Sequence, residues 1–298
     1  SMARINTVEK LVSATQSTSA LAHSIVIPDD TKLSSIRTID LSADTHASST
    51  STVTLTGVTV AMSVIGVAGS DVVTGGSAAD TISTAGGTDA IVGGAGSDTL
   101  TGGEGADTIT GGTDNDAIVL TETTSAVDKV VFSGGTVAAG AAPTAHLTAN
   151  GADVITGFAS AADTINVAAL GDGTTSATGL TPITAAASKG ALADDIVSII
   201  STTGAAANLT TSGTLTVSDW TNMSQVSAYL NERYTVTSSA NRDVIIINNT
   251  AGSNDTSYVY TLSNSAADTT IDTADIVLVG TITHTAGTAL ASSNVVYS

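Results

Sequence analysis

Between Gly66 and Val119 the chain repeats a unit of nine residues six times without a gap. An aspartate occupies the sixth place of every copy, and a Val, Ile or Leu occupies the eighth. A short fixed period predicts a solenoid, in which each repeat adds one layer and buries its apolar residue against its neighbours. The copies begin at Gly66, Gly75, Thr84, Gly93, Gly102 and Gly111.

Each copy combines a glycine-rich turn with a short strand. The bulky eighth residue is flanked by small or polar residues, as expected for an inward-facing side chain on a three-residue strand. Glycine lets the turn adopt positive φ angles and lets backbone carbonyl groups crowd around an ion. A flexible linker is the alternative for such a composition. A linker, however, has no reason to place an Asp two residues before an apolar residue in all six copies.

The sixth-place aspartates are the candidate ligands of a metal. Carboxylate oxygen suits Ca²⁺, which takes six to eight oxygen ligands at about 2.3–2.6 Å. We therefore predict a row of calcium ligands formed by Asp71, Asp80, Asp89, Asp98, Asp107 and Asp116.

The fourth and fifth copies, GGAGSDTLT and GGEGADTIT, match the pattern GGxGxDxUx at every specified position. Here the chain resembles the RTX (repeats-in-toxin) family of proteins, which bacteria export by type I secretion. The resemblance implies a mainly β fold, a right-handed parallel β-helix or β-roll in which two nonapeptides form one coil. It also implies that each calcium ion lies between turns two repeats apart, which gives about four ions or more. The implied pairs are Asp71 with Asp89, Asp89 with Asp107, Asp80 with Asp98, and Asp98 with Asp116.

Some copies depart from this pattern. Ala78 replaces the fourth-place glycine of the second copy, and Thr84 and Ala85 open the third. Asp114 takes the fourth place of the last copy, where aspartate tolerates the left-handed conformation and can add a ligand at the end of the row. We expect the outer sites to be weaker than the inner ones.

Residues 1–65 are predicted to be a lead-in of the same solenoid without calcium motifs. Residues 36–43 echo residues 5–14, and strand-like runs follow at 53–56 and 62–65. These runs are rich in Val, Ile, Thr and Ser, which favour strands. A strand-rich, Thr/Ser-rich lead-in before a short repeat array resembles bacterial surface-layer (S-layer) proteins.

Residues 120–180 are predicted to continue and cap the roll. Residues 120–149 form a loop-rich segment with one strand at 127–132. The segments 151–158 and 162–170 resemble the closing part of RTX domains, which makes Asp153 and Asp163 candidate ligands of capping calcium ions and Phe158 a cover for the apolar stack. Solvated turn residues are the alternative interpretation of both aspartates.

Residues 181–298 are predicted to form a small α+β domain. One helix is expected from the spacing of Leu192, Ile196, Ile199 and Ile200, with Gly204 after its last turn. A second helix carries Trp220, Met223, Val226 and Leu230 and begins at Ser218 or Asp219. The apolar stripes of both helices are interpreted as core faces, with a ligand groove or a partner-binding surface as the alternatives. Strands are expected at 244–247, 258–262 and 276–279. The resemblance places a secretion signal at the extreme C-terminus.

The charge of the chain restricts its partners. A formal net charge of −19, from 8 Lys and Arg against 27 Asp and Glu, excludes nucleic acid and disfavours an anionic membrane. No run approaches the ~18–20 apolar residues that cross a bilayer, so we expect no membrane insertion. The chain has no cysteine, so disulfides cannot stabilise it, whereas ligated calcium can.

We expect no enzymatic activity. The sequence holds no HExxH, GxSxG or phosphate-binding loop. The histidines are expected at the surface, because each stands alone in an unrelated context: His23, His46, His146 and His284.

The predicted function is a calcium-dependent folding, secretion and assembly module of a bacterial cell-surface structural protein of S-layer type. The expected partners are Ca²⁺, the type I secretion machinery and further copies in a surface lattice. We expect the chain to be the C-terminal part of a longer, secreted protein, whose remaining region can bind cell-surface polysaccharide. An RTX adhesin or biofilm-matrix module is the main alternative, and an accessory domain of a secreted hydrolase is the second.

Overall fold

A computed structural model of the chain is built mainly of β-strands. It divides into two compact units, Ser1–Val131 and Phe132–Ser298. Among the residues it describes, no helix is long and apolar enough to cross a membrane. The described residues are 10–12, 19–28, 35–133, 151–170, 190–192, 197–202, 217, 219–236, 242–249, 255–263, 270–284 and 290–296.

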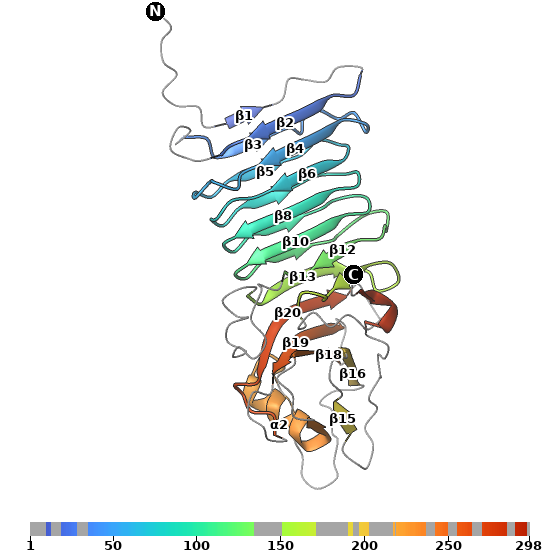
Figure 1. Ribbon diagram of the computed structural model, residues 1–298. Helices are drawn as coiled ribbons and strands as arrows, with labels where there is room; N and C mark the ends of the chain where they lie inside the picture. The colour runs from blue at the N-terminus through green and yellow to red at the C-terminus, as the bar shows by residue number, and fades with distance from the viewer. Residues whose placement is uncertain are drawn as a thin grey trace, which may run out of the picture. The chain divides into compact units, whose positions relative to one another are not determined.

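Two parallel sheets make up the first unit, and the chain alternates between them (Figure 1). One sheet holds β1 (Lys10–Val12), β3 (Thr38–Asp40), β5 (Ser63–Ile65), β7 (Thr81–Ser83), β9 (Thr99–Thr101) and β11 (Ala117–Val119). The other holds β2 (Ala22–Val26), β4 (Thr50–Thr54), β6 (Asp71–Thr74), β8 (Ala90–Ala95), β10 (Thr108–Thr113) and β12 (Lys129–Val131). Two nonapeptides therefore form one coil, which confirms the predicted parallel β-roll.

The eighth-place residues form the core of the roll. Val73 pairs with Ile91, and Ile91 with Ile109, so one apolar column runs through the second sheet. The equivalent column of the first sheet joins Ile82 to Leu100. These side chains are at most 1% exposed. Burying each one stabilises the fold by about 1.5–3 kcal/mol relative to leaving it in water.

The lead-in belongs to the same stack. Val53 of β4 pairs with Val73 of β6, and Val64 of β5 pairs with Ile82 of β7. The solenoid is thus continuous from the lead-in into the repeats, as predicted. Of the echoed segment 5–14, only the residues of β1 lie within the described part of the chain.

The second unit contains one mixed sheet and two short strand pairs. The mixed sheet runs in the order β13 (Asp153–Phe158), β20 (Ile276–His284), β19 (Thr256–Ser263), β18 (Arg242–Asn249), β16 (Val197–Thr202). The pairs join β14 (Thr164–Asn166) to β21 (Val295–Val296) and β15 (Gly190–Leu192) to β17 (Tyr234–Val236), and a 3-10 turn, η1, spans Ser292–Asn294. The strands predicted within 127–132, 244–247, 258–262 and 276–279 are all found, and the segments 151–158 and 162–170 contain β13 and β14.

The predicted second helix is present as α2 (Met223–Arg233), but it begins later than expected. Its N-cap is Asn222, whose side chain accepts from the N–H groups of Ser224 and Gln225. Asp219, one of the two predicted caps, instead accepts from the N–H of Thr221 at 2.9 Å. Ser218 lies outside the described residues. The apolar stripe is core, as predicted, since the cluster of buried residues includes Trp220, Val226 and Leu230.

The predicted helix over 192–200 is wrong. Leu192 ends β15, and Ile199 and Ile200 lie in β16, which pairs in parallel with β18. Val197 and Ile200 are at most 2% exposed, so β16 is buried on both faces and its apolar run imitates a helical stripe. The β-branched side chains of this run favour the strand. Ile196 and Gly204 fall outside the described residues, as do residues 134–149 of the loop-rich segment predicted over 120–149 and the last two residues of the chain.

Candidate metal centre

The sixth-place aspartates form two columns at the turns of the roll. All six are at most 2% exposed. Within each column, Oδ1 of one carboxylate accepts the backbone N–H of the aspartate 18 residues earlier. The four pairs expected two repeats apart are therefore adjacent. The distances from the backbone N of the first residue to Oδ1 of the second are 2.8 Å for Asp71–Asp89, 3.0 Å for Asp89–Asp107, 2.7 Å for Asp80–Asp98 and 2.9 Å for Asp98–Asp116.

In the five copies that begin with glycine, the other carboxylate oxygen, Oδ2, lies over this first-place glycine, whereas the third copy begins with Thr84. A Cβ on Gly102 would stand 2.1 Å from Oδ2 of Asp107, and one on Gly93 would stand 2.3 Å from Oδ2 of Asp98. Real Cβ atoms essentially never approach so closely. Where the first residue is glycine, its lack of a Cβ makes room for the carboxylate.

Three of these carboxylates are buried with an unsatisfied oxygen. Oδ2 of Asp89, of Asp98 and of Asp107 accepts no hydrogen bond. A buried acceptor without a donor costs about 1–3 kcal/mol, and more when it is charged. A hard cation that binds this oxygen removes the cost, so the residues fit calcium.

The remaining ligands of such a cation come from backbone carbonyl groups and from water. Across the described residues, no three or more His, Cys, Asp or Glu side chains gather into a group that holds a metal. Each site therefore takes one or two carboxylates from the columns and completes its shell with carbonyl oxygens of the glycine-rich turns and with water.

Burial raises the pKa of Asp98 and Asp107 to about 7, and repulsion from neighbouring carboxylates adds to this effect. Burial likewise raises the pKa of Asp89 and Asp116 to about 6. Ionised carboxylates are therefore disfavoured in the roll itself. A cation between the turns reverses this preference and holds the carboxylates ionised.

Two departures from the repeat pattern fit the turns well. Thr84 is buried, and its hydroxyl donates to the carbonyl of Gly102 at 2.7 Å. Asp114 is exposed with φ at 76°, and its Oδ2 accepts from the N–H of Gly96 at 3.2 Å. Asp114 thus has the predicted left-handed conformation and contacts the turn two copies earlier.

The two predicted capping ligands, Asp153 and Asp163, are buried rather than solvated, each 2% exposed. Asp153 begins β13, and Oδ2 of Asp163 accepts from the N–H of Ala159 at 2.7 Å. Phe158 is fully buried and packs edge-to-face on His284, with ring centroids 5.5 Å apart.

Sequence reasoning missed Asp128, which extends one column beyond the repeats. It is 1% exposed, and its Oδ1 accepts from the N–H of Asp107 at 2.9 Å. The separation is 21 residues instead of 18, because the preceding turn is longer. A local signal exists, since Asp128 stands two residues before the buried Val130, as in every repeat.

The surface position predicted for His284 is wrong. Its side chain is 4% exposed, and its Nε2 lies 2.7 Å from Oγ of the buried Ser257. Burial lowers the pKa of His284. His23 is partly buried, with its Nε2 2.9 Å from Oδ2 of Asp44, and His146 is outside the described residues.

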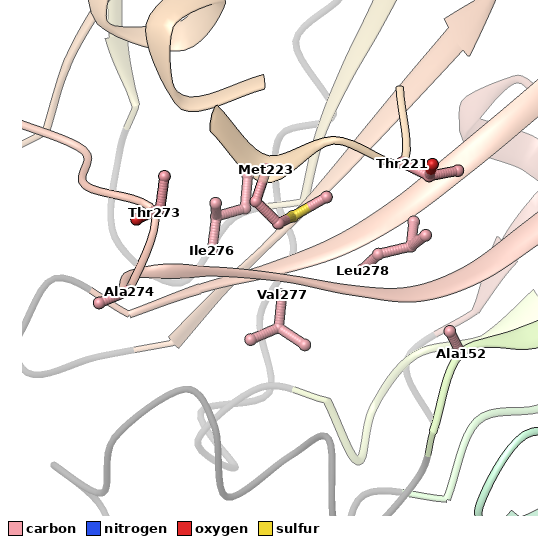
Figure 2. A pocket seen from close by; sticks show the side chains of 8 residues that line it. All are labelled: Ala152, Thr221, Met223, Thr273, Ala274, Ile276, Val277 and Leu278. Atoms are coloured by element: carbon pink, nitrogen blue, oxygen red, sulfur yellow. The ribbon is translucent and has the colours of Figure 1, made fainter. Parts of the chain in front are cut away.

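A pocket of about 260 Å³ lies in the second unit beside β20. Figure 2 shows Ile276 and Leu278 directed toward Met223, while Val277 points to the other side of the strand. The rest of the lining comes from Ala152, Thr221, Thr273 and Ala274. The only polar side chains of the lining are two threonine hydroxyls, so its chemistry is unlike that of the aspartate columns.

Comparison with protein families supports the repeat assignment. The model of the RTX calcium-binding nonapeptide repeat, which spans four copies, matches residues 65–100 and again residues 83–118. No match is found among curated proteins. The matched stretch holds both aspartate columns and every first-place glycine of the array. Residues 65–118 are therefore an array of RTX calcium-binding nonapeptide repeats.

Proposed function

We propose that this chain is the calcium-dependent folding, secretion and assembly module of a bacterial cell-surface structural protein of S-layer type. One observation carries the proposal. Buried carboxylates stand in register along the roll, and those of Asp89, Asp98 and Asp107 each keep one oxygen without a donor.

Calcium acts in this proposal as a switch for folding. Ordering the backbone costs about 1–2 kcal/mol per residue, and desolvation and repulsion of the aspartates add to that cost. In a cytosol that is low in calcium, the repeats stay extended enough for a type I secretion channel. Outside the cell, calcium bridges successive turns, and its binding free energy becomes folding free energy. Dissociation constants of about 10⁻⁴–10⁻³ M suit extracellular calcium modules.

Assembly follows folding in the proposed sequence of events. Calcium offsets the net charge of −19, which otherwise makes copies repel one another. Val72 and Val92, on neighbouring strands β6 and β8, are 49% and 39% exposed and offer apolar contacts on the outer face of one sheet. The proposed role is structural and involves no catalysis.

Electron microscopy of the chain with calcium, with magnesium and with a chelator tests the proposal. We expect ordered two-dimensional sheets in calcium alone. Folded monomers in calcium would contradict the proposed assembly into a lattice and would favour the adhesin alternative. Full β-structure in excess chelator, measured by circular dichroism, would remove the folding switch.

A further inference from the structure

The six turns of the repeat array fall into two conformational classes. In the third to sixth copies, the second and fourth residues all have positive φ angles, between 74° and 128°. Within residues 66–83, every one of which is described, no residue has a positive φ angle. The left-handed residues are Ala85, Gly87, Gly94, Gly96, Gly103, Gly105, Gly112 and Asp114.

This difference changes what the sixth-place carboxylate contacts. In the first copy, the N–H of Val67 donates to Oδ2 of Asp71 at 3.0 Å. In the second copy, the N–H of Gly76 donates to Oδ2 of Asp80 at 2.8 Å. Each of these two turns therefore satisfies its own carboxylate through the second-place amide, and we call such turns closed.

Protein donors also satisfy the other oxygens of these two carboxylates. Oδ1 of Asp71 accepts from the hydroxyl of Ser51 at 2.5 Å. Oδ1 of Asp80 accepts from the N–H of Met62 at 2.8 Å. Both acceptors are thus fully used by the lead-in coils, and they need no cation.

The later copies lack this closure. The left-handed second residue turns its peptide, so the amide does not reach the carboxylate. Oδ2 of Asp89, Asp98 and Asp107 is left buried without a donor. We call the turns of the third to sixth copies open, because their left-handed second residue leaves free for an ion the place that the amide takes in a closed turn.

A turn in the second unit repeats the closed arrangement. Oδ2 of Asp163 accepts the N–H of Ala159, four residues earlier, just as Asp71 accepts from Val67. Ala159 has no positive φ angle. The closed turn, in which a backbone N–H satisfies the carboxylate, is thus an alternative to a calcium-binding turn. It occurs at three places in this chain.

We propose that the array binds two calcium ions in complete sites, one between the turns of Asp89 and Asp107 and one between those of Asp98 and Asp116. These are the two same-side pairs in which both turns are open. The pairs Asp71–Asp89 and Asp80–Asp98 each include a closed turn and take no ion of their own. This inference rests on the proposed calcium switch and limits it to residues 84–116.

The division gives the roll a calcium-independent template. Residues 35–83 complete their carboxylate contacts with protein donors, so their coils form without the ion. The open turns then stack on these coils as calcium arrives. Folding therefore proceeds along the array from the end that has the closed turns. There, β6 and β7 provide ordered edges with which the next strands pair.

Native mass spectrometry of the full chain titrated with calcium tests the division. We expect Asp98→Asn and Asp107→Asn each to lower the number of bound ions by one relative to the unmodified chain. The matched variants Asp71→Asn and Asp80→Asn leave that number unchanged. A lower number for either closed-turn variant, or an unchanged number for either open-turn variant, overturns the proposal.

Hydrogen exchange of the unmodified chain gives a readout that does not depend on how the variants fold. Peptides from residues 66–83 should be equally protected in chelator and in calcium, whereas those from 84–116 gain protection only in calcium. Equal gains in both segments overturn the division but keep the calcium switch. No calcium effect on either segment overturns the switch itself.

Discussion

At the residue scale, the first-place glycine and the sixth-place aspartate of a repeat lie in direct contact in the five copies that begin with glycine. The carboxylate of Asp107 folds back over the Cα of Gly102, where a Cβ would stand 2.1 Å from Oδ2. The conflict involves a side-chain oxygen, so the carboxylate must move rather than the backbone. A change at the glycine therefore acts on the proposed ligand without altering its chemistry.

Gly102→Ala should consequently displace the Asp107 carboxylate. We expect a loss of stability of about 1–3 kcal/mol, typical of overpacking, together with a weaker apparent calcium affinity. Calcium titration followed by circular dichroism measures both effects. Gly86→Ala is the matched control, since its Cβ would meet its nearest atom, the carbonyl oxygen of Glu104, at 3.5 Å. Equal effects of the two variants would contradict this role of the first glycine.

The raised pKa values predict opposite pH dependences with and without calcium. Asp98 and Asp107 have folded-state pKa values of about 7, against 3.8 for an unperturbed aspartate. Without calcium the folded roll binds protons more tightly than the unfolded chain, so its stability falls as pH rises from about 4 to about 7. With calcium the ionised carboxylates are ligands, and the roll loses its ions on acidification.

Thermal unfolding between pH 4 and pH 8 checks this inversion. In chelator, the melting temperature of the roll should decrease toward pH 8. In saturating calcium, it should increase over the same range. A melting temperature that rises with pH in chelator would show that the buried carboxylates are ionised without a cation.

At the element scale, α2 shows how a local rule locates a helix but misplaces its start. The stripe of Val226 and Leu230 predicts the helix, and Asp219 and Asn222 are both good capping residues. Only the structure distinguishes them, because the choice depends on where the chain leaves Trp220 in the core. The buried strand β16 is the opposite case, where tertiary burial overrides a helical spacing.

Asn222→Ala should destabilise the second unit by about 1 kcal/mol, the usual cost of removing an N-cap. Asp219→Ala should cost less, since the carboxylate of Asp219 bonds an exposed turn instead of the helix. Urea unfolding followed by Trp220 fluorescence compares the two variants. A larger cost for Asp219→Ala would mean that the helix begins where the sequence predicted.

Whether a turn is open or closed could not be predicted from the sequence. The nine-residue period predicted the strands and the core column, whereas the pairing of the aspartates was implied by the resemblance to RTX repeats. The turn class depends on backbone φ, which composition does not reveal. Gly76 has the residue type expected in an open turn yet lies in a closed one, whereas Ala85 adopts the left-handed angle without being glycine. Asp128 was missed for a related reason, since a longer turn shifted it out of period.

At the scale of the whole molecule, the two compact units differ in how they are stabilised. The first unit is stabilised by its apolar columns and by its buried aspartates, some of which lie in open turns. The second has a core built around Trp220, Tyr229 and Tyr260, and the Tyr260 hydroxyl donates to the carbonyl of Trp220 at 2.6 Å. Each calcium site adds about 2.7 kcal/mol to the first unit when the free ion is at 100 times its dissociation constant.

Chelation should therefore unfold the open-turn part of the first unit and leave the second folded. Trp220 is the only tryptophan of the chain and is 6% exposed, so its fluorescence reports the second unit alone. We expect excess chelator to reduce the β signal in circular dichroism while the emission maximum of Trp220 stays constant. Readdition of calcium should restore the signal, and magnesium at equal concentration is the control. A red shift of Trp220 emission in chelator would contradict this separation and would make the second unit depend on calcium as well.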